Sequence, residues 1–387
     1  MNNLNSLLLI ALIINLGCKS EANISVDDNF KSELSQKLNE YFKTLSKIQQ
    51  FNGGVYIKRD GETVLKEIYL MTEDKDSSLY ADIESQFDIH SVSKLMAKAC
   101  IVKMEEKGQI DRKDKLSKYI PNFPRGDEIT IENLLNNESG LPRELRGEHD
   151  NLIEKSPEEL VELIKGEKLL FKPGSEKLYS NLGYQLIYYI ISELNGKPFV
   201  KYMDEEFFKP LKMKDTGAHF HLGKNNYKRG VTNHIKDEGV IKSVPNFEKD
   251  EKNQAKVYST LSDLMSFIEK MKEEPYATKL KNSEGNIGWS GGGDGIRSHL
   301  QTSFRSNYDF AFFSNSDEIP FNKILEDVEK IMTGRPYKKP KEINRKSVKL
   351  DREVMQRYMG KYDMAEFNQH EFEFRVEGDS FVFYQNG

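Results

Sequence analysis

Residues 87–108 read "FDIHSVSKLMAKACIVKMEEKG". The stretch opens with a short apolar run that favours a strand. From Val92 its apolar residues recur three or four positions apart until Gly108, which is typical of a helix. Ser91 stands at the start of that helix, and Lys94 follows three positions later. Because three residues make about one helical turn, we expect both side chains on the same face.

The spacing of Ser91 and Lys94 suits nucleophilic chemistry. A serine hydroxyl needs a base to accept its proton, and lysine serves only where burial and neighbouring charges lower its pKa from about 10.4. The apolar face would remove water from the Lys94 ammonium, and a backbone N–H at the helix start can bind an oxyanion. Alone, the motif also fits a helix cap beside a surface lysine, so it needs support from elsewhere.

Three further stretches give that support. They are "ITIENLLNNESGLP" (129–142), "KPGSEKLYSNLGYQLIYYII" (172–191) and "NIGWSGGGDGIRSHL" (286–300). With these stretches in this order, residues 50 to about 333 resemble the superfamily of serine β-lactamases and penicillin-binding proteins. The chain is similar in particular to the family of class C β-lactamases, esterases and D-amino peptidases. Asn137 departs from that family, in which a histidine is usual at this place.

The resemblance implies a role for each matching residue. Ser91 would be the acylated nucleophile and Lys94 the base that activates it. Tyr179 would share the base role as a coupled pair with Lys94 and return the proton to the leaving group. Asn181 would bind the acyl group of the substrate through a hydrogen bond.

The third motif is Trp289-Ser290-Gly291, where the family commonly has K-T-G or H-x-G. The resemblance makes these residues substrate-binding and assigns the oxyanion hole to the N–H groups of the nucleophile and Gly292. Lysine in this motif helps to bind a substrate carboxylate, and Trp289 lacks the charge. Arg297 could replace it if its side chain points inward, although a surface role fits equally well. Trp289 offers instead an apolar face suited to an uncharged acyl chain.

The order of strands, helices, strands and helix predicts an α+β fold. The resemblance specifies a β-lactamase/transpeptidase-like domain over 30–334, with an antiparallel sheet flanked by helices and a mostly helical subdomain. An Asp60-Gly61 turn favours a β-hairpin, and Thr260 to Asp263 has the form of a capping box before a helix over 264–271. Strands are expected at 296–304 and 308–314, and helices at 30–50, 182–194 and 324–332.

Composition excludes some classes of function. The chain has 387 residues and a formal charge of −5, with no basic footprint for nucleic acid. His219 and His221 have the spacing of two metal ligands on a strand, but no Cys or acidic partner accompanies them. The resemblance implies neither a metal nor a cofactor, and the expected partner is a small ester, amide or peptide substrate.

Both ends of the chain differ from its middle. Residues 1–18 resemble a signal peptide that ends in a lipobox-like Cys18, which predicts a lipid-anchored protein of the bacterial cell envelope. Periplasmic or secreted protein and a buried apolar arm are the alternatives. The only other cysteine, Cys100, is expected to be a buried apolar residue. Residues 335–347 favour a linker, and 348–387 a C-terminal β module that we expect to be truncated.

These observations predict an exported serine hydrolase that acts on esters or small amides through an acyl-enzyme. A D-alanyl or D-amino-acid peptidase, or a weak β-lactamase of cell-wall metabolism, is the first alternative. The second is a catalytically silent binding protein with the same fold. A loss of catalysis is disfavoured, because the sequence keeps all of Ser91, Lys94, Tyr179 and Asn181.

Overall fold

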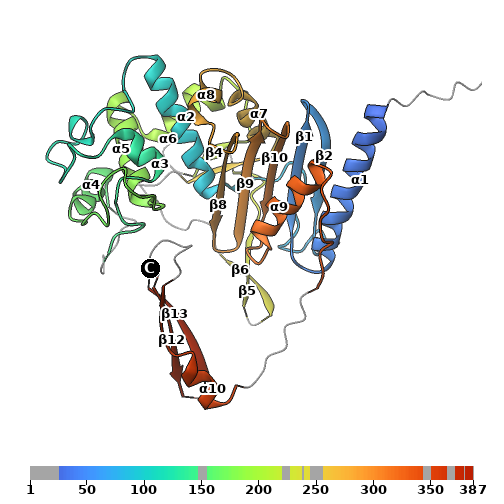
Figure 1. Cartoon of the computed structure of the whole chain (residues 1–387). Helices are drawn as coiled ribbons and strands as arrows, with labels where there is room; N and C mark the ends of the chain where they lie inside the picture. Colours follow the sequence, from blue (N-terminus) through green and yellow to red (C-terminus); the bar gives the residue numbers. More distant parts are fainter. Residues whose placement is uncertain are drawn as a thin grey trace, which may run out of the picture.

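The computed structural model describes residues 26–146, 155–219, 227–237, 239–244, 256–342, 350–363, 371–378 and 380–386. Its centre is a five-stranded antiparallel sheet with the strand order β2-β1-β10-β9-β8. The strands are β1 (Gly53–Arg59), β2 (Glu62–Tyr69), β8 (Asn286–Gly293), β9 (Ile296–Ser303) and β10 (Tyr308–Ser314). Two hairpins far apart in the sequence therefore meet where β1 pairs with β10, and β8 is left at an edge (Figure 1).

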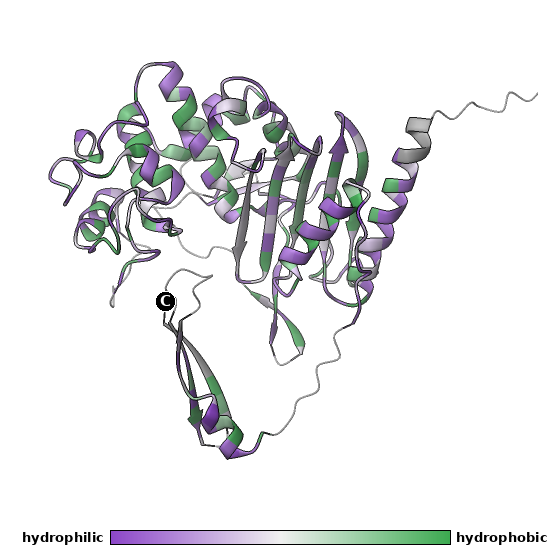
Figure 2. Cartoon of the chain, viewed as in Figure 1, coloured by the Kyte–Doolittle hydropathy of each residue, from purple (hydrophilic) through white to green (hydrophobic). Residues whose placement is uncertain are grey.

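Helices cover both faces of this sheet. On one face α1 (Val26–Lys47) and α9 (Phe321–Met332) enclose an apolar cluster with side chains of β1, β2 and β10. On the other face lie α2 (Ser93–Glu106) and α7 (Leu261–Lys270), which share the larger cluster with the helical region. All seven residues of β10 are buried, because this central strand is covered on both sides. Figure 2 shows apolar residues along the strands between these helices.

A helical region lies beyond α2 (Figure 1). It contains α3 (Ile131–Asn136), α4 (Pro157–Lys165), α5 (Asn181–Asn195) and α6 (Phe199–Met203). The apolar helix α5 is central, since it contacts α2, α3, α4 and α6. A small sheet of β3 (Phe87–Asp88), β7 (Val257–Ser259) and β4 (Gly217–Ala218) anchors the start of α2. The short helix α8 (Tyr276–Leu280) also packs against α2.

The predicted fold class is confirmed, and most predicted elements are present within a few residues. The Asp60-Gly61 hairpin forms between β1 and β2, with both turn residues at positive φ. The helix predicted over 264–271 is α7, which begins earlier, at Leu261, and the capping box before it is only half formed. The Thr260 side chain accepts from the Asp263 N–H, but the Asp263 carboxylate accepts from Thr216 and the Asp215 N–H instead of closing the box.

Two features were not predicted. The glycine-rich run 286–293 was expected only to precede a strand, but it is itself the edge strand β8. A second hairpin, β5 (Asn233–Asp237) with β6 (Val240–Val244), carries too little apolar alternation to be recognised.

The remaining described segments carry no part of the site. Helix α10 (Arg352–Arg357) precedes a three-stranded sheet of β11 (Gly360–Asp363), β12 (Glu371–Glu377) and β13 (Ser380–Asn386).

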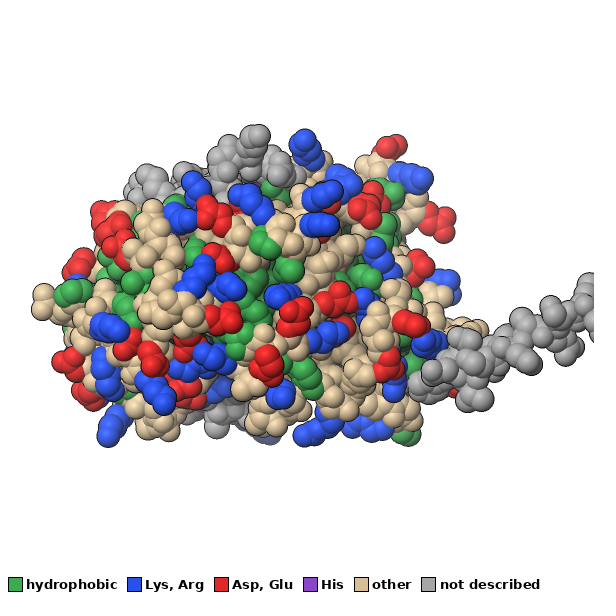
Figure 3. Space-filling view, turned by 90° about the horizontal axis from the view of Figure 1, so that it is seen from above, with side chains coloured by type: hydrophobic (Ala, Val, Ile, Leu, Met, Phe, Trp, Pro, Cys, Tyr) green, Lys and Arg blue, Asp and Glu red, His purple; other side chains and the backbone are tan. Residues whose placement is uncertain are grey.

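Acidic and basic side chains are interspersed over the face seen in Figure 3. In the part of the chain that the structure describes, no helix is long and apolar enough to span a membrane. Residues 1–25, with the predicted leader and Cys18, lie outside that part.

Candidate active site

Ser91 lies in a tight turn between a strand and a helix. The turn is the 3-10 segment His90–Val92, which follows β3 and runs directly into α2. The Ile89 N–H donates to the Val257 carbonyl (3.0 Å), and the Val92 N–H donates to the Ile89 carbonyl (3.1 Å). His90 adopts a φ of 45°, a costly value for a residue with a side chain. The surrounding hydrogen bonds hold this conformation, so the nucleophile is presented on a fixed backbone.

Lys94 lies one turn into α2 with its side chain turned toward Ser91. Its Nζ donates to the Ser91 Oγ at 2.9 Å, and the residue is only 7% exposed. The ammonium also lies 5.1 Å from the Tyr179 ring centroid and 5.6 Å from that of Tyr184. Among the described residues no carboxylate comes within ion-pair distance of Lys94, so aromatic faces and the serine hydroxyl are its surroundings.

Tyr179 completes the arrangement from the segment directly before α5. Its hydroxyl lies 2.8 Å from the Ser91 Oγ. The Ser91 Oγ is therefore within hydrogen-bonding distance of both predicted base residues, Lys94 and Tyr179. Arg143 covers the Tyr179 ring, with its guanidinium carbon 5.4 Å from the centroid. The structure thus brings together the three residues for which catalytic roles were predicted.

Local hydrogen bonds place the Tyr179-Ser180-Asn181 segment. Ser180 is the N-cap of α5: its Oγ accepts from the Gly183 N–H (3.0 Å) and donates to the Pro142 carbonyl (2.7 Å). The side-chain oxygen of Asn137 accepts from the Ser180 N–H (3.1 Å), and Asn137 itself ends α3 in the left-handed conformation. Asn137, the departure noted in the sequence, is therefore a buried support for this segment.

The glycines of β8 allow its backbone to approach the nucleophile. A Cβ added to Gly291 would lie 2.3 Å from the Ile89 carbonyl oxygen, 2.4 Å from the Ser298 Oγ and 3.0 Å from the Ser91 nitrogen. Only glycine fits this contact without movement of backbone. Gly292, the next residue, lines the same cavity as Ser91. This close approach suits the predicted oxyanion hole, which needs backbone N–H donors from β8 and from the turn.

Other residues of the third motif point elsewhere. The Ser290 Oγ lies 2.9 Å from the His299 Nδ1, and His299 packs against Phe312 and Phe321 beneath α9. Arg297 donates to the carbonyls of Gly293 (2.6 Å) and Ile296 (2.7 Å). Neither Ser290 nor Arg297 lines the cavity at Ser91. Strand alternation explains this, because successive side chains of β8 and β9 face opposite sides of the sheet.

Trp289 packs behind Tyr179. Its ring centroid lies 5.5 Å from that of Tyr184 and 6.5 Å from that of Tyr179, and the Lys98 Nζ lies 5.2 Å from the indole. The described residues that line the cavity at Ser91 do not include Trp289. Its indole therefore contacts Tyr179 rather than offering the acyl-chain surface expected from the sequence.

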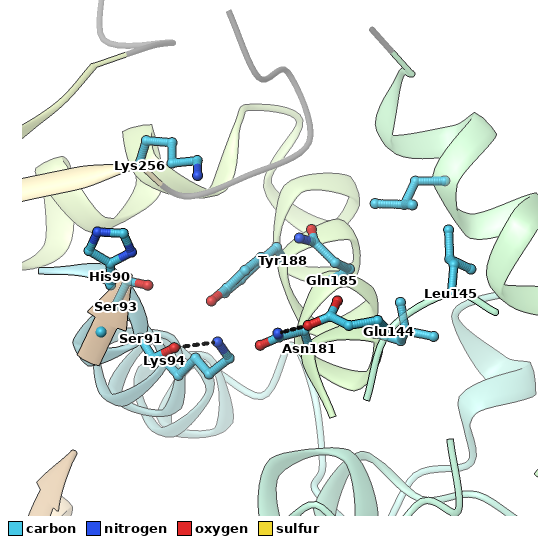
Figure 4. Close-up of a pocket in the computed structure, with 13 residues that line it drawn as sticks. His90, Ser91, Ser93, Lys94, Glu144, Leu145, Asn181, Gln185, Tyr188 and Lys256 are labelled. Carbon is cyan, nitrogen blue, oxygen red and sulfur yellow. Dashed lines mark hydrogen bonds between the residues drawn. The ribbon is translucent and has the colours of Figure 1, made fainter. Parts of the chain in front are cut away.

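The cavity at Ser91 has a volume of about 360 Å³ (Figure 4). Asn181 lies on one wall and donates through its Nδ2 to the Glu144 carboxylate. Leu145, Leu160, Leu182 and Tyr188 supply apolar surface. The cavity therefore combines a polar reacting centre with walls that are partly apolar and partly polar.

Sequence reasoning missed several of the lining residues. His90, Glu144, Gln185, Tyr188 and Lys256 all line the cavity. Burial, aided by the nearby cations, lowers the pKa of His90 to about 4, so its imidazole is neutral near pH 7. Its position directly before the nucleophile was the only feature of the sequence that could have indicated that His90 lines the cavity. Gln185 and Tyr188 lie in the 172–191 stretch but beyond its Tyr-Ser-Asn motif, and Glu144 and Lys256 come from segments that carry no chemical motif.

His219, one of the two histidines with metal-ligand spacing, and Cys100 both have structural surroundings. The His219 Nε2 lies 2.6 Å from the Asp88 Oδ1 beneath the nucleophile turn, whereas His221 is outside the described residues. Burial raises the pKa of the Cys100 thiol well above its usual value, so this cysteine stays protonated and poorly nucleophilic.

Comparisons with known proteins agree with this geometry. The family model described as "Beta-lactamase" matches residues 38–313, more than half of the chain. The putative penicillin-binding protein PbpX of Bacillus subtilis is 30% identical over 199 residues, which cover 51% of this chain and 47% of that relative. Penicillin-binding protein 4* of B. subtilis is 25% identical over 385 residues, covering 86% and 84%. The chain thus matches about half the length of PbpX and most of the second relative.

Solved structures share the fold. One is described as EstCE1, a hydrolase with promiscuous acyltransferase activity. It aligns with a TM-score of 0.64 at 15% identity and covers 80% of this chain and 100% of that one. At this identity the similarity concerns the fold alone.

Proposed function

The chain belongs to the beta-lactamase family, whose fold is that of serine hydrolases, and we propose that it hydrolyses esters or small amides through an acyl-enzyme. One observation carries the proposal: the Ser91 Oγ lies 2.9 Å from the Lys94 Nζ and 2.8 Å from the Tyr179 hydroxyl. Such a contact lets a weak nucleophile lose its proton during attack.

In the proposed mechanism the Ser91 Oγ attacks the substrate carbonyl carbon while its proton passes to the Lys94–Tyr179 pair. The N–H groups of Ser91 and Gly292 stabilise the oxyanion, a contribution of about 3 kcal/mol for a single donor. The intermediate collapses when the bond to the leaving group breaks and Tyr179 returns a proton to that group. Water then attacks the acyl-Ser91 ester, and the same pair accepts a proton from the water and returns one to the Ser91 Oγ.

A substrate panel with mass spectrometry tests this proposal. We expect p-nitrophenyl esters to be hydrolysed and a mass increase equal to the acyl group to appear on the Ser91 peptide. Nitrocefin and D-Ala peptides in the same panel distinguish a β-lactamase or a D-amino-acid peptidase. Binding of all these compounds without turnover or adduct would favour the silent binding protein.

The third motif of this chain lacks the lysine that helps to bind a substrate carboxylate in this family. A charge-assisted contact of that kind is worth about 1.5 to 3 kcal/mol. The leucines around Ser91 instead suit an uncharged acyl chain. We therefore expect kcat/KM for short-chain esters to exceed that for nitrocefin or D-Ala-D-Ala peptides by at least about tenfold, the factor that 1.4 kcal/mol provides.

A cation added to the wall of the cavity tests this preference. Leu145→Lys should narrow the gap by improving kcat/KM for carboxylate-bearing substrates, whereas Leu145→Met, which keeps an apolar side chain in the wall, should not. Efficient hydrolysis of β-lactams or D-Ala termini by the wild type contradicts the preference. Lys256, which lines the cavity, then becomes the first candidate for the carboxylate anchor.

We further propose that the protein is exported and anchored to the bacterial cell envelope by a lipid on Cys18. The apolar run before Cys18 and the small residue Gly17 motivate this proposal. Metabolic labelling with a fatty-acid probe should mark the wild type and not Cys18→Ser. A mature N-terminus at any other residue would contradict the anchor and leave periplasmic or secreted protein as the alternative.

A further inference from the structure

The backbone at His90 is strained, and this residue lies directly before the nucleophile. Its φ of 45° falls in the left-handed region, which glycine adopts at little cost and a residue with a Cβ does not. A glycine at this place would avoid the cost, yet the chain has a histidine. Strain of this kind persists only where the surroundings hold it, and it gathers at functional sites. The contacts of the imidazole ring therefore call for an explanation.

The imidazole of His90 lies against the backbone of Gly293 on β8. A Cβ added to Gly293 would lie 2.4 Å from the His90 Cε1, 2.9 Å from its Nε2 and 3.0 Å from its Nδ1. The ring thus occupies the space that a side chain at residue 293 would need. Gly291 makes the other close approach of β8, to the Ile89 carbonyl and the Ser91 nitrogen. Residues two apart share a face of a strand, so both glycines meet the nucleophile turn on one side of β8.

Gly292 lies between these two contacts. It is the predicted second donor of the oxyanion hole, and it lines the cavity together with Ser91 and His90. β8 is an edge strand that pairs with β9, and its glycines have no side chains with which to pack. The His90 ring supplies a side-chain contact at Gly293, the last residue of this strand. Loss of the ring would leave a gap between the turn and the end of β8.

We propose that His90 is a positioning residue: its ring, packed between the nucleophile turn and Gly293, fixes the distance between the N–H groups of Ser91 and Gly292. This inference rests on the proposed acyl-enzyme function, in which both N–H groups bind the oxyanion. Such donors act because they are already in place when the charge develops, and a displacement of about 1 Å can cost about 10²-fold in rate. Burial lowers the pKa of His90 to about 4, so near pH 7 the ring acts by packing and not by charge.

His90→Gly tests this role, because it removes the ring and relieves the backbone cost at the same time. It should lower kcat for a p-nitrophenyl ester by about 10- to 100-fold, while KM changes by less than about twofold, because the oxyanion develops only on attack. Acylation and deacylation should slow together, since each passes through an oxyanion. Burst kinetics separate the two steps.

Two further substitutions act as controls. Asn122 is exposed, has a φ of 60° and does not line the cavity, so Asn122→Gly should leave kcat and KM at wild-type values. His90→Asn also accepts a positive φ and keeps a shorter planar side chain, so its loss of kcat should be smaller than that of His90→Gly. It also serves as the test variant should His90→Gly fail to fold.

A double variant tests the contact itself. Gly293 lies in a strand and has a φ outside the left-handed region, so its backbone accepts alanine. Gly293→Ala places a methyl group where the ring of His90 lies, so this variant should also lose kcat. With His90→Gly added, the methyl group has room, and kcat should exceed that of Gly293→Ala by at least about twofold, the lower end of the coupling between residues in contact. Losses that simply multiply would show that the ring and β8 act independently.

Amide hydrogen exchange gives a measurement that needs no substrate. The β8 amides should exchange faster in His90→Gly than in the wild type, because loss of the ring lowers the free energy of local opening. Unchanged exchange or an unchanged kcat would overturn the inference. A loss confined to deacylation would also overturn it, since that result indicates a base for the attacking water. A wild type that hydrolyses no ester contradicts the proposed function, and the exchange comparison then still decides whether His90 holds β8.

Discussion

Ser91→Ala should abolish hydrolysis, with a loss of kcat on the order of 10⁶, as expected when a catalytic nucleophile is removed. No other serine in the described residues combines a helix start with a lysine one turn further and a tyrosine hydroxyl at 2.8 Å. A fluorophosphonate or penicillin should therefore form its adduct on the peptide that contains Ser91, and the adduct should be absent from the variant. Stopped assays and peptide mass spectrometry measure the two effects.

Stability separates this result from unfolding. The substitution removes the hydrogen bonds of the Ser91 Oγ with the Lys94 Nζ and the Tyr179 hydroxyl, which changes the free energy of unfolding by about 1 to 3 kcal/mol. Ser266→Ala is the control: Ser266 lies on α7, its Oγ donates to the Ser262 carbonyl (3.2 Å), and the variant should keep full labelling. An adduct that persists in Ser91→Ala, on Ser180 or elsewhere, would show that the nucleophile is a different residue.

The sequence predicts the parts of this site that depend on local spacing. Ser91 and Lys94 are neighbours on one helix face, so their 2.9 Å contact follows from periodicity. Tyr179 lies 88 positions from Ser91. No spacing rule for helices or strands predicts that Tyr179 contacts the Ser91 hydroxyl, and only the family resemblance predicted this contact. The hairpin and the strands of the sheet were recognisable from turn residues and apolar runs.

The parts that sequence could not predict depend on side-chain direction. Glycine is rare in strands, which hid the edge strand β8, yet the glycines are there because the backbone must approach Ser91. Which side of that strand each residue faces depends on register, and a shift of one position reverses it. For this reason Ser290 faces His299, whereas Trp289 lies on the same side as Gly291, where its indole packs behind Tyr179 and not toward an acyl chain.

The positions of the two lysine side chains on α2 were likewise not predictable from the sequence. Lys94 and Lys98 are separated by one turn and look equivalent in the sequence, but they line different cavities. Lys94 contacts the nucleophile, whereas Lys98 faces the Trp289 indole. Only the tertiary packing of α5 and β8 around α2 places the two lysines in separate cavities.

Lys94→Met and Tyr179→Phe should each slow acylation by about 10² to 10⁴, the usual contribution of general acid–base catalysis. Methionine keeps the apolar stem of Lys94 in its buried position, and phenylalanine keeps the Tyr179 ring that packs near Trp289. Both variants therefore remove proton transfer with little change of packing, and their melting temperatures should stay close to that of the wild type. Burst kinetics with a p-nitrophenyl ester measure the acylation step directly.

The double variant shows whether Lys94 and Tyr179 act as one base. Both groups contact the same Ser91 Oγ, so removal of either one should disable a shared proton relay. The double variant should then lose much less than the product of the two single losses, since residues that act as a unit are not additive. Lys103→Met, on the same helix but away from the site, should acylate at the wild-type rate. Normal acylation in both single variants would place the base elsewhere, and fully multiplicative losses would indicate two independent contributions at Ser91.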